Sequence, residues 1–174
     1  MRIFAIDPGA QAKPTPKNPR PDPACHGWCW IDIPPGERPV WMEAGHSTEQ
    51  VVRQKMLHAG CTVVVERPVR AHREAAGMSL LEAAFEAGRF YGYALGNGIA
   101  AGVLSAEQWR TAVTGLRSPS DAQVKEALSR LMDLPKRSNA HERDACGLAV
   151  GFALRAGYLV GGRGRLTPPA KRAG

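Results

Sequence analysis

The chain has 174 residues and a mass of 18.7 kDa. This length fits one domain, because two halves would each struggle to bury an adequate core. Lysine and arginine number 23 against 16 acidic residues, and the resulting formal charge of +7 favours a polyanionic partner. No apolar stretch is long enough to span a bilayer, and residues 2–6 resemble a strand rather than a signal peptide. We therefore expect a cytoplasmic protein that does not associate with membranes.

Short apolar runs bounded by proline and glycine predict three strands early in the chain, at residues 2–7, 26–33 and 40–44. The segment 10–25 carries five prolines, a composition that favours an extended loop. We interpret it as a basic insertion between the first two strands. Its basic residues are Lys13, Lys17 and Arg20.

Helices are expected to separate the later strands. Ser47 can cap a helix that runs to about residue 59, and the apolar run at 61–66 suits a central strand covered on both faces. The elements expected after it are a helix at 79–96, a strand at 99–104, and helices from Ser105 to 113, from Ser118 or Ser120 to 132, and from Asn139 to 156. This succession predicts an α/β fold with a mixed sheet flanked by helices.

Three acidic residues lie in or beside apolar sequence, where an unpaired charge is costly to bury: Asp7, Glu66 and Asp144. Asp7 and Glu66 end predicted strands, which is where open α/β sheets gather their ligand sites. His141 precedes Asp144 by three residues, so both side chains share one helical face. Carboxylates with one imidazole suit a hard divalent cation, Mg²⁺ or Mn²⁺.

Each of these residues also has a plain structural interpretation. Asp7 before Pro8-Gly9 could cap a turn, and Glu66 could form a strand-end ion pair with Arg67. A single histidine near a helix start is more often not a ligand. The joint arrangement of two strand-end carboxylates with a later His-x-x-Asp is what favours a metal site.

Four short segments follow one another along the chain: Ile6-Asp7-Pro8-Gly9, Val65-Glu66, Trp109 to Gly115, and His141-Glu142-Arg143-Asp144-Ala145. In this order they resemble the RuvC family of Holliday junction resolvases within the RNase H-like superfamily. The resemblance runs from Met1 to about Ala156 and implies an RNase H-like fold with a central mixed five-stranded sheet flanked by helices on both faces. We expect one nuclease domain over 1–157 and a basic tail at 158–174. The size and the insertion are compatible with a phage-type member.

The resemblance also implies an activity, that of a crossover junction endodeoxyribonuclease. Such an enzyme uses two Mg²⁺ ions per active site to make paired cuts in a four-way junction, leaving 5′-phosphate and 3′-hydroxyl ends. The family motif places the metal ligands at Asp7, Glu66, His141 and Asp144, with Arg110 near the cleaved phosphate.

The chain departs from the family pattern at two positions. Asp121 stands where relatives carry a second lysine, which leaves Lys125 or Arg117 as substitutes. Val69 stands where relatives often have an aromatic residue that contacts bases at the junction. Both departures bear on junction specificity.

The expected partners are branched DNA and a second copy of the chain. A four-way junction has approximate two-fold symmetry, which suits a homodimer with two active sites, and the small-residue helix at 79–96 is the candidate interface. The residues expected to contact DNA are Lys13, Lys17, Arg20, Arg67, Arg70, Arg73, Arg117 and Lys125.

Two alternatives stay open. The first is a less selective nuclease of the same fold that acts on branched DNA or on RNA/DNA hybrids. The second is a non-catalytic DNA-binding protein, against which the complete set of four predicted ligands argues.

Overall fold

In the computed structural model, the described residues are 1–9, 25–35, 37–58, 60–68, 77–134 and 139–159. Within them, one mixed sheet of five strands runs in the order β3-β2-β1-β4-β5. The strands are β1 (Arg2–Asp7), β2 (Cys25–Asp32), β3 (Val40–Thr48), β4 (Thr62–Arg67) and β5 (Ala101–Ser105). The helices are α1 (Glu49–His58), α2 (Gly77–Gly96), α3 (Ala106–Thr114), α4 (Asp121–Leu131) and α5 (Ala140–Arg155).

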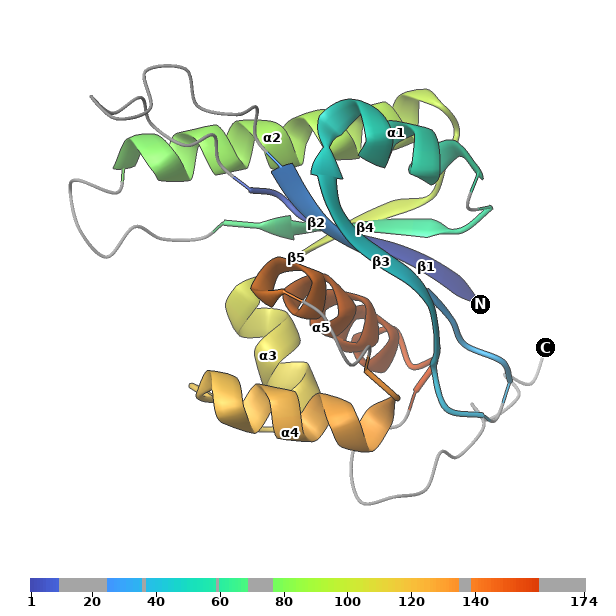
Figure 1. Ribbon diagram of the computed structural model, residues 1–174, viewed down its shortest axis with the longest axis vertical. Coiled ribbons are helices and arrows are strands. Elements are labelled where there is room, and N and C mark those ends of the chain that lie inside the picture. The colour runs from blue at the N-terminus through green and yellow to red at the C-terminus, as the bar shows by residue number, and fades with distance from the viewer. Residues whose placement is uncertain (10–24, 36, 59, 69–76, 135–138, 160–174) are drawn as a thin grey trace.

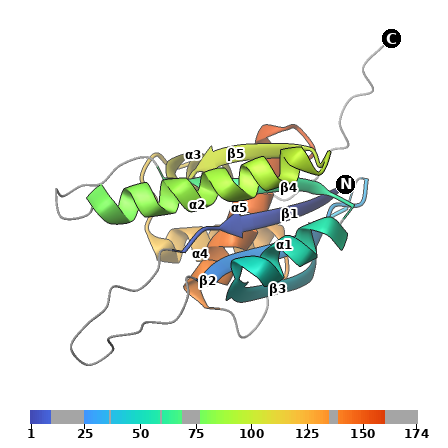
Figure 2. The same ribbon diagram turned by 90° about the horizontal axis from the view of Figure 1, so that it is seen from above.

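Helices cover both faces of the sheet (Figure 1, Figure 2). α1 and α2 lie on one face, and α3, α4 and α5 lie on the other. β1 is the middle strand: it pairs antiparallel with β2 and parallel with β4, and residues 3–6 are fully buried. The predicted architecture, a mixed five-stranded sheet flanked by helices on both faces, is confirmed.

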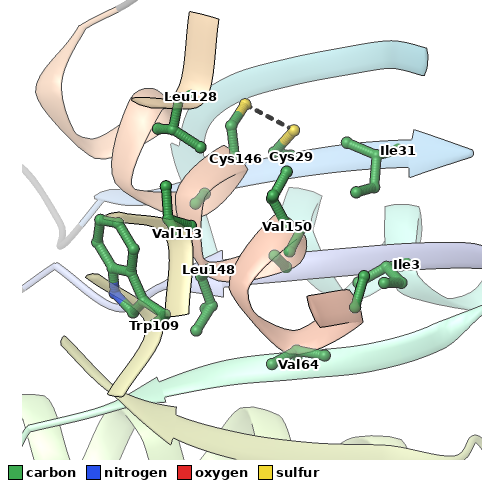
Figure 3. Close-up of a cluster of buried hydrophobic side chains, with 14 of the residues drawn as sticks. Ile3, Cys29, Ile31, Val64, Trp109, Val113, Leu128, Cys146, Leu148 and Val150 are labelled. Carbon is green, nitrogen blue, oxygen red and sulfur yellow. Dashed lines mark hydrogen bonds between the residues drawn. The ribbon is translucent and has the colours of Figure 1, made fainter. Parts of the chain in front are cut away.

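A hydrophobic core lies on each face of the sheet. Side chains alternate between faces along a strand, so Ile3 and Ala5 of β1 and Val64 of β4 point toward α5. There they pack with Trp109 of α3 and Leu148 of α5 (Figure 3). The alternate residues of the same strands pack on the other face, against α1 and α2; they are Phe4, Ile6, Val63 and Val65. Asp7 and Glu66 therefore continue the two rows that face α5.

The structure corrects the predicted boundary between β3 and α1. β3 continues to Thr48, which pairs with Cys25, so the strand is longer than the predicted 40–44. Ser47 is a strand residue whose hydroxyl accepts a hydrogen bond of 3.2 Å from Nε1 of Trp28. It is not the helix cap that the sequence suggested, because the pairing with β2 extends further than the local pattern indicates.

The three later helices begin at capping residues that the sequence identifies. Ser105, Ser120 and Asn139 each cap a helix, and each forms a reciprocal capping box with the residue three positions on. Of the two serines considered for α4, Ser120 is the cap. β5 begins at Ala101 rather than at 99, because Gly98 takes a left-handed φ of 70° and closes the end of α2. None of the helices in the described ranges has the length and hydropathy to span a bilayer.

Candidate active site

Two carboxylates lie side by side at the ends of neighbouring strands. β1 and β4 are parallel, and Ile6 pairs with Val65. The next residues along each strand, Asp7 and Glu66, are therefore brought to the same edge of the sheet, on the face that α5 covers. The adjacency expected from the two strand ends follows directly from this register.

The first turns of α5 bring His141 and Asp144 to the same edge. Asn139 caps the helix, and Gly27 of β2, which pairs with Asp7, lies under its start. A Cβ at Gly27 would be 2.5 Å from the backbone oxygen of His141, so only glycine permits this approach. As a result, Nδ1 of His141 lies 2.7 Å from Oδ2 of Asp7, although 134 residues separate them.

Glu66 is the most perturbed carboxyl group of the site. Burial raises its pKa from 4.5 to about 7, and the negative charges of Asp7 and Asp144 add to this increase. A hydrogen bond from Nε1 of Trp109 to Oε2, 2.7 Å long, opposes it. The side chain is thus held as a carboxyl group that is only partly ionised near neutral pH.

The pKa values of Asp144 and His141, which lie close to other acidic side chains of the site, are also raised. Burial raises the pKa of Asp144, and the Arg110 guanidinium 3.6 Å away opposes the increase. The pKa of His141 is raised above its usual value chiefly by the hydrogen bond to Asp7. Burial and the neighbouring charge of Asp7 disfavour ionisation of Glu66 and Asp144, an arrangement that a bound cation would stabilise.

The donor set fits a hard divalent cation in its chemistry. Carboxylate oxygens with one imidazole suit Mg²⁺ or Mn²⁺. The side chains are not already gathered around one point: in the described parts of the chain, no three His, Cys, Asp or Glu side chains are placed to share an ion. One oxygen of Asp7 is engaged by His141 and one of Glu66 by Trp109.

A cavity of about 220 Å³ opens beside Asp144, between α3, α4 and α5. Arg110 and Lys125 are among its lining residues, and Arg110 also forms a 2.7 Å ion pair with Asp121. Asp121, where the family pattern has a lysine, therefore pairs with the expected phosphate-binding cation. The cavity therefore brings the positive side chains of Arg110 and Lys125 next to Asp144, at the edge of the sheet where the carboxylates lie.

The structure brings together the predicted residues Asp7, Glu66, His141, Asp144 and Arg110. Two more predicted basic residues, Arg67 and Arg117, are exposed, at the end of β4 and after α3 respectively. The other predicted DNA contacts, together with Val69, lie outside the described residues; these contacts are Lys13, Lys17, Arg20, Arg70 and Arg73.

Two aromatic residues of the site were assigned no role from the sequence. His46 of β3 stacks on His141, with ring centroids 5.3 Å apart and planes 6° from parallel. His46 pairs with Gly27 across the sheet. Because Gly27 has no side chain, nothing at that position separates His46 from α5. Trp109 lies within a motif that the sequence singled out, but nothing in the motif's spacing indicates its hydrogen bond to Glu66.

Comparison with protein-family models gives no match, and no curated protein matches the sequence. Solved structures do match. Thermus thermophilus RuvC in complex with a Holliday junction substrate superposes with a TM-score of 0.62 at 14% identity, over 90% of this chain and 94% of that one. The chain has the RuvC fold. A second T. thermophilus RuvC structure matches with a TM-score of 0.57, also at 14% identity, over 90% of this chain and 95% of that one.

The yeast mitochondrial Holliday junction resolvase Ydc2 also matches, with a TM-score of 0.49 and 11% identity over 87% of this chain and 77% of that one. At identities this low, the comparison with RuvC establishes the fold. In this chain the sheet order is β3-β2-β1-β4-β5 and α5 packs across β1 and β2. The four predicted ligands lie on β1, β4 and α5.

Proposed function

We propose that this chain is a Mg²⁺-dependent endonuclease that resolves Holliday junctions by paired phosphodiester cuts. The observation that carries the proposal is the meeting of Asp7, Glu66, His141 and Asp144, from three separate elements, at one edge of a RuvC fold. The chemistry of these donors supports the metal. The match to a RuvC structure that contains a junction supports the substrate.

In this proposal, Asp7, Glu66, Asp144 and His141 would hold two Mg²⁺ ions. When bound, such ions would supply an activated water and stabilise the leaving oxygen. Asp7 orients His141 through their 2.7 Å contact. Arg110, 3.6 Å from Asp144, neutralises charge that develops on the phosphate in the transition state. Hydrolysis then leaves 5′-phosphate and 3′-hydroxyl ends.

The DNA backbone is proposed to pass the cavity beside Asp144. Arg110 and Lys125 line it, and the exposed Arg67 and Arg117 extend the positive surface. The predicted basic residues outside the described ranges would add further phosphate contacts. Since each neutralised phosphate releases counterions, affinity is expected to fall steeply as salt concentration rises.

We further propose a homodimer formed through the outer face of α2. This face, on the opposite side of the sheet from the site, exposes large apolar side chains: Leu81 is 64% exposed, Phe85 68% and Leu95 51%. Gly88 and Gly92 lie between them, and a Cβ at either would meet nothing within 4 Å. An apolar, low-relief helix face of this kind suits a second copy related by two-fold symmetry.

Replacing Phe85 with Glu is expected to dissociate the dimer, because it places a charge in the middle of the apolar face. Sedimentation at micromolar concentration should then change from a dimer to a monomer, and paired cutting should give way to single nicks. Tyr158→Glu, at another exposed aromatic, is the matched control and should stay dimeric. A wild-type chain that sediments as a monomer at all concentrations would contradict this interface.

The function is tested with a synthetic four-way junction in Mg²⁺ and in EDTA. The expected result is a pair of symmetric cuts in Mg²⁺ whose nicks DNA ligase can seal, and no cutting in EDTA. A fork, a flap and an RNA/DNA hybrid of matched length separate the less selective nuclease from the resolvase. Binding of the junction without cutting of any substrate would favour the non-catalytic alternative.

We also propose that residues 1–157 form the nuclease domain, with a basic insertion at 10–25, and that residues 158–174 form a basic tail. Deleting residues 160–174, which keeps the buried Leu159, should then weaken DNA binding and leave the fold intact. The insertion and the tail both carry basic residues in addition to those on the described surface.

A further inference from the structure

Trp109 makes a direct hydrogen bond to a proposed metal ligand while being fully buried itself. Its Nε1 donates to Oε2 of Glu66 at 2.7 Å, and its side chain has no exposed surface. An indole N–H can only donate, so this contact has a single polarity. A hydrogen bond from a buried donor to a carboxylate is charge-assisted and stronger than a neutral one.

The position of the indole is fixed from behind by two glycines of α5. A Cβ at Gly147 would lie 2.4 Å from Cζ3 of Trp109, and one at Gly151 would lie 2.7 Å from its Cβ. The benzene edge of the ring, remote from the N–H, therefore presses directly on the α5 backbone. Figure 3 shows the ring beside the core residues Val113 and Leu148.

Both ends of α3, the helix that carries Trp109, are capped. Ser105 closes its start with a capping box, and Gly115 closes its end with a left-handed φ of 73°. The capped ends of α3 and the close packing against Gly147 and Gly151 therefore restrict both the backbone and the ring of Trp109. The indole N–H therefore donates its hydrogen bond to the Glu66 carboxylate from a defined position.

We propose that Trp109 is a positioning residue for Glu66. Its N–H holds one carboxylate oxygen and so leaves the other available to a cation. The inference rests on the proposed function, since it assigns Glu66 the role of a metal ligand.

The arrangement links two ligands through one helix. Asp144, Gly147 and Gly151 follow one another at spacings of three and four residues, so they share a face of α5. The same helical face carries one ligand and sets, through the indole, the position of another ligand on β4. Displacement of α5 would therefore move Glu66 as well as Asp144.

The test measures Mn²⁺ binding to the full chain without DNA, by the electron paramagnetic resonance signal of free Mn²⁺. Trp109→Phe keeps an aromatic ring but removes the donor, and we expect it to weaken Mn²⁺ binding roughly 10- to 100-fold, the usual effect of losing a hydrogen-bond partner of a ligand. Val113→Ala removes buried packing from the same helix and is expected to leave Mn²⁺ affinity within about twofold, because an apolar side chain donates no hydrogen bond to a ligand. If Trp109→Phe and Val113→Ala behave alike, the role of Trp109 is structural and the inference is overturned.

A second variant removes the donor without changing shape. Benzothienylalanine at position 109 replaces the indole N–H with sulfur, and it should reproduce the weakened Mn²⁺ binding even if Trp109→Phe folds poorly. Unchanged affinity with this residue would overturn the inference. In addition, the NMR resonance of the indole N–H can be assigned by its loss in Trp109→Phe. This resonance should shift in Glu66→Gln, and an unchanged chemical shift in that variant would show that the hydrogen bond is absent.

These readouts separate the inference from the proposed function. Weakened Mn²⁺ binding in the Trp109 variants, together with a wild type that cuts no junction, would leave the positioning role standing and overturn the nuclease. Cutting by the wild type, together with unchanged Mn²⁺ binding in the Trp109 variants, would do the reverse. A wild type that binds no Mn²⁺ would overturn both.

Discussion

Replacing Glu66 with Gln is expected to raise the free energy of unfolding of the metal-free protein at pH 8 by up to about 3 kcal/mol, since each pKa unit is worth about 1.4 kcal/mol. The physical reason is that burial raises the Glu66 pKa from 4.5 to about 7. Below pH 4.5 the carboxyl is protonated in both the folded and the unfolded chain. Between pH 4.5 and about 7 the unfolded chain ionises while the folded chain keeps its proton, so stability falls across this range. Above about pH 7 the stability associated with the proton is lost. Glutamine carries no such charge.

The gain in stability should therefore be small at pH 5 and largest at pH 8. Urea unfolding in EDTA at the two pH values measures it, with Glu107→Gln, an exposed acid on α3, as the control that should show no pH-dependent gain. Saturating Mg²⁺ should stabilise the wild type at pH 8 and stabilise Glu66→Gln much less, because ligands stabilise only the state that binds them. Equal stability of wild type and Glu66→Gln at pH 8 would contradict the buried-carboxylate geometry.

Replacing Asp7 with Asn is expected to reduce junction cutting about 10³-fold, because it removes several kcal/mol of metal-dependent transition-state stabilisation. Asp7 contacts His141 and ends the strand next to Glu66, which places it at the centre of the proposed site. Asparagine has nearly the same shape, and the proposed phosphate contacts are elsewhere, so junction affinity should stay close to that of the wild type. Cleavage is measured by single-turnover strand mapping and affinity by fluorescence anisotropy in EDTA.

The matched control for this variant is Asp32→Asn. Asp32 lies at the far end of the β1–β2 pair, opposite Arg2, and its partners are Arg2 and the chain's amino group. It should cut normally. Near-normal cutting by Asp7→Asn would mean that the metal site lies elsewhere on the protein.

Much of the architecture could be predicted from local sequence. The apolar runs that end in Asp7 and Glu66 are short and bounded by turn residues, and parallel neighbours then force the two carboxylates together. The caps at Ser105 and Asn139 follow from polar residues placed three positions before Gln108 and Glu142. These features depend on a few neighbouring residues, which is why they can be read from the chain alone.

Contacts set by register could not be predicted in this way. His46 meets His141 only because Gly27 pairs with it across the sheet, and a register shift at Trp30/Ile31 decides that pairing. The misplaced cap at Ser47 has the same origin. The contact between Cys29 and Cys146, 117 residues apart, likewise depends on where α5 crosses β2, which no local pattern specifies.

The proposed chemistry is divided between two stretches of polypeptide. Asp7 and Glu66 belong to the part that ends with β4, whereas Arg110, His141 and Asp144 belong to the part that begins with α2. A backbone cut between Arg67 and Gly77 would therefore give two fragments, neither of which holds a whole catalytic set. Fused to proteins that associate, such fragments could form a complementation pair whose junction cutting reports the association.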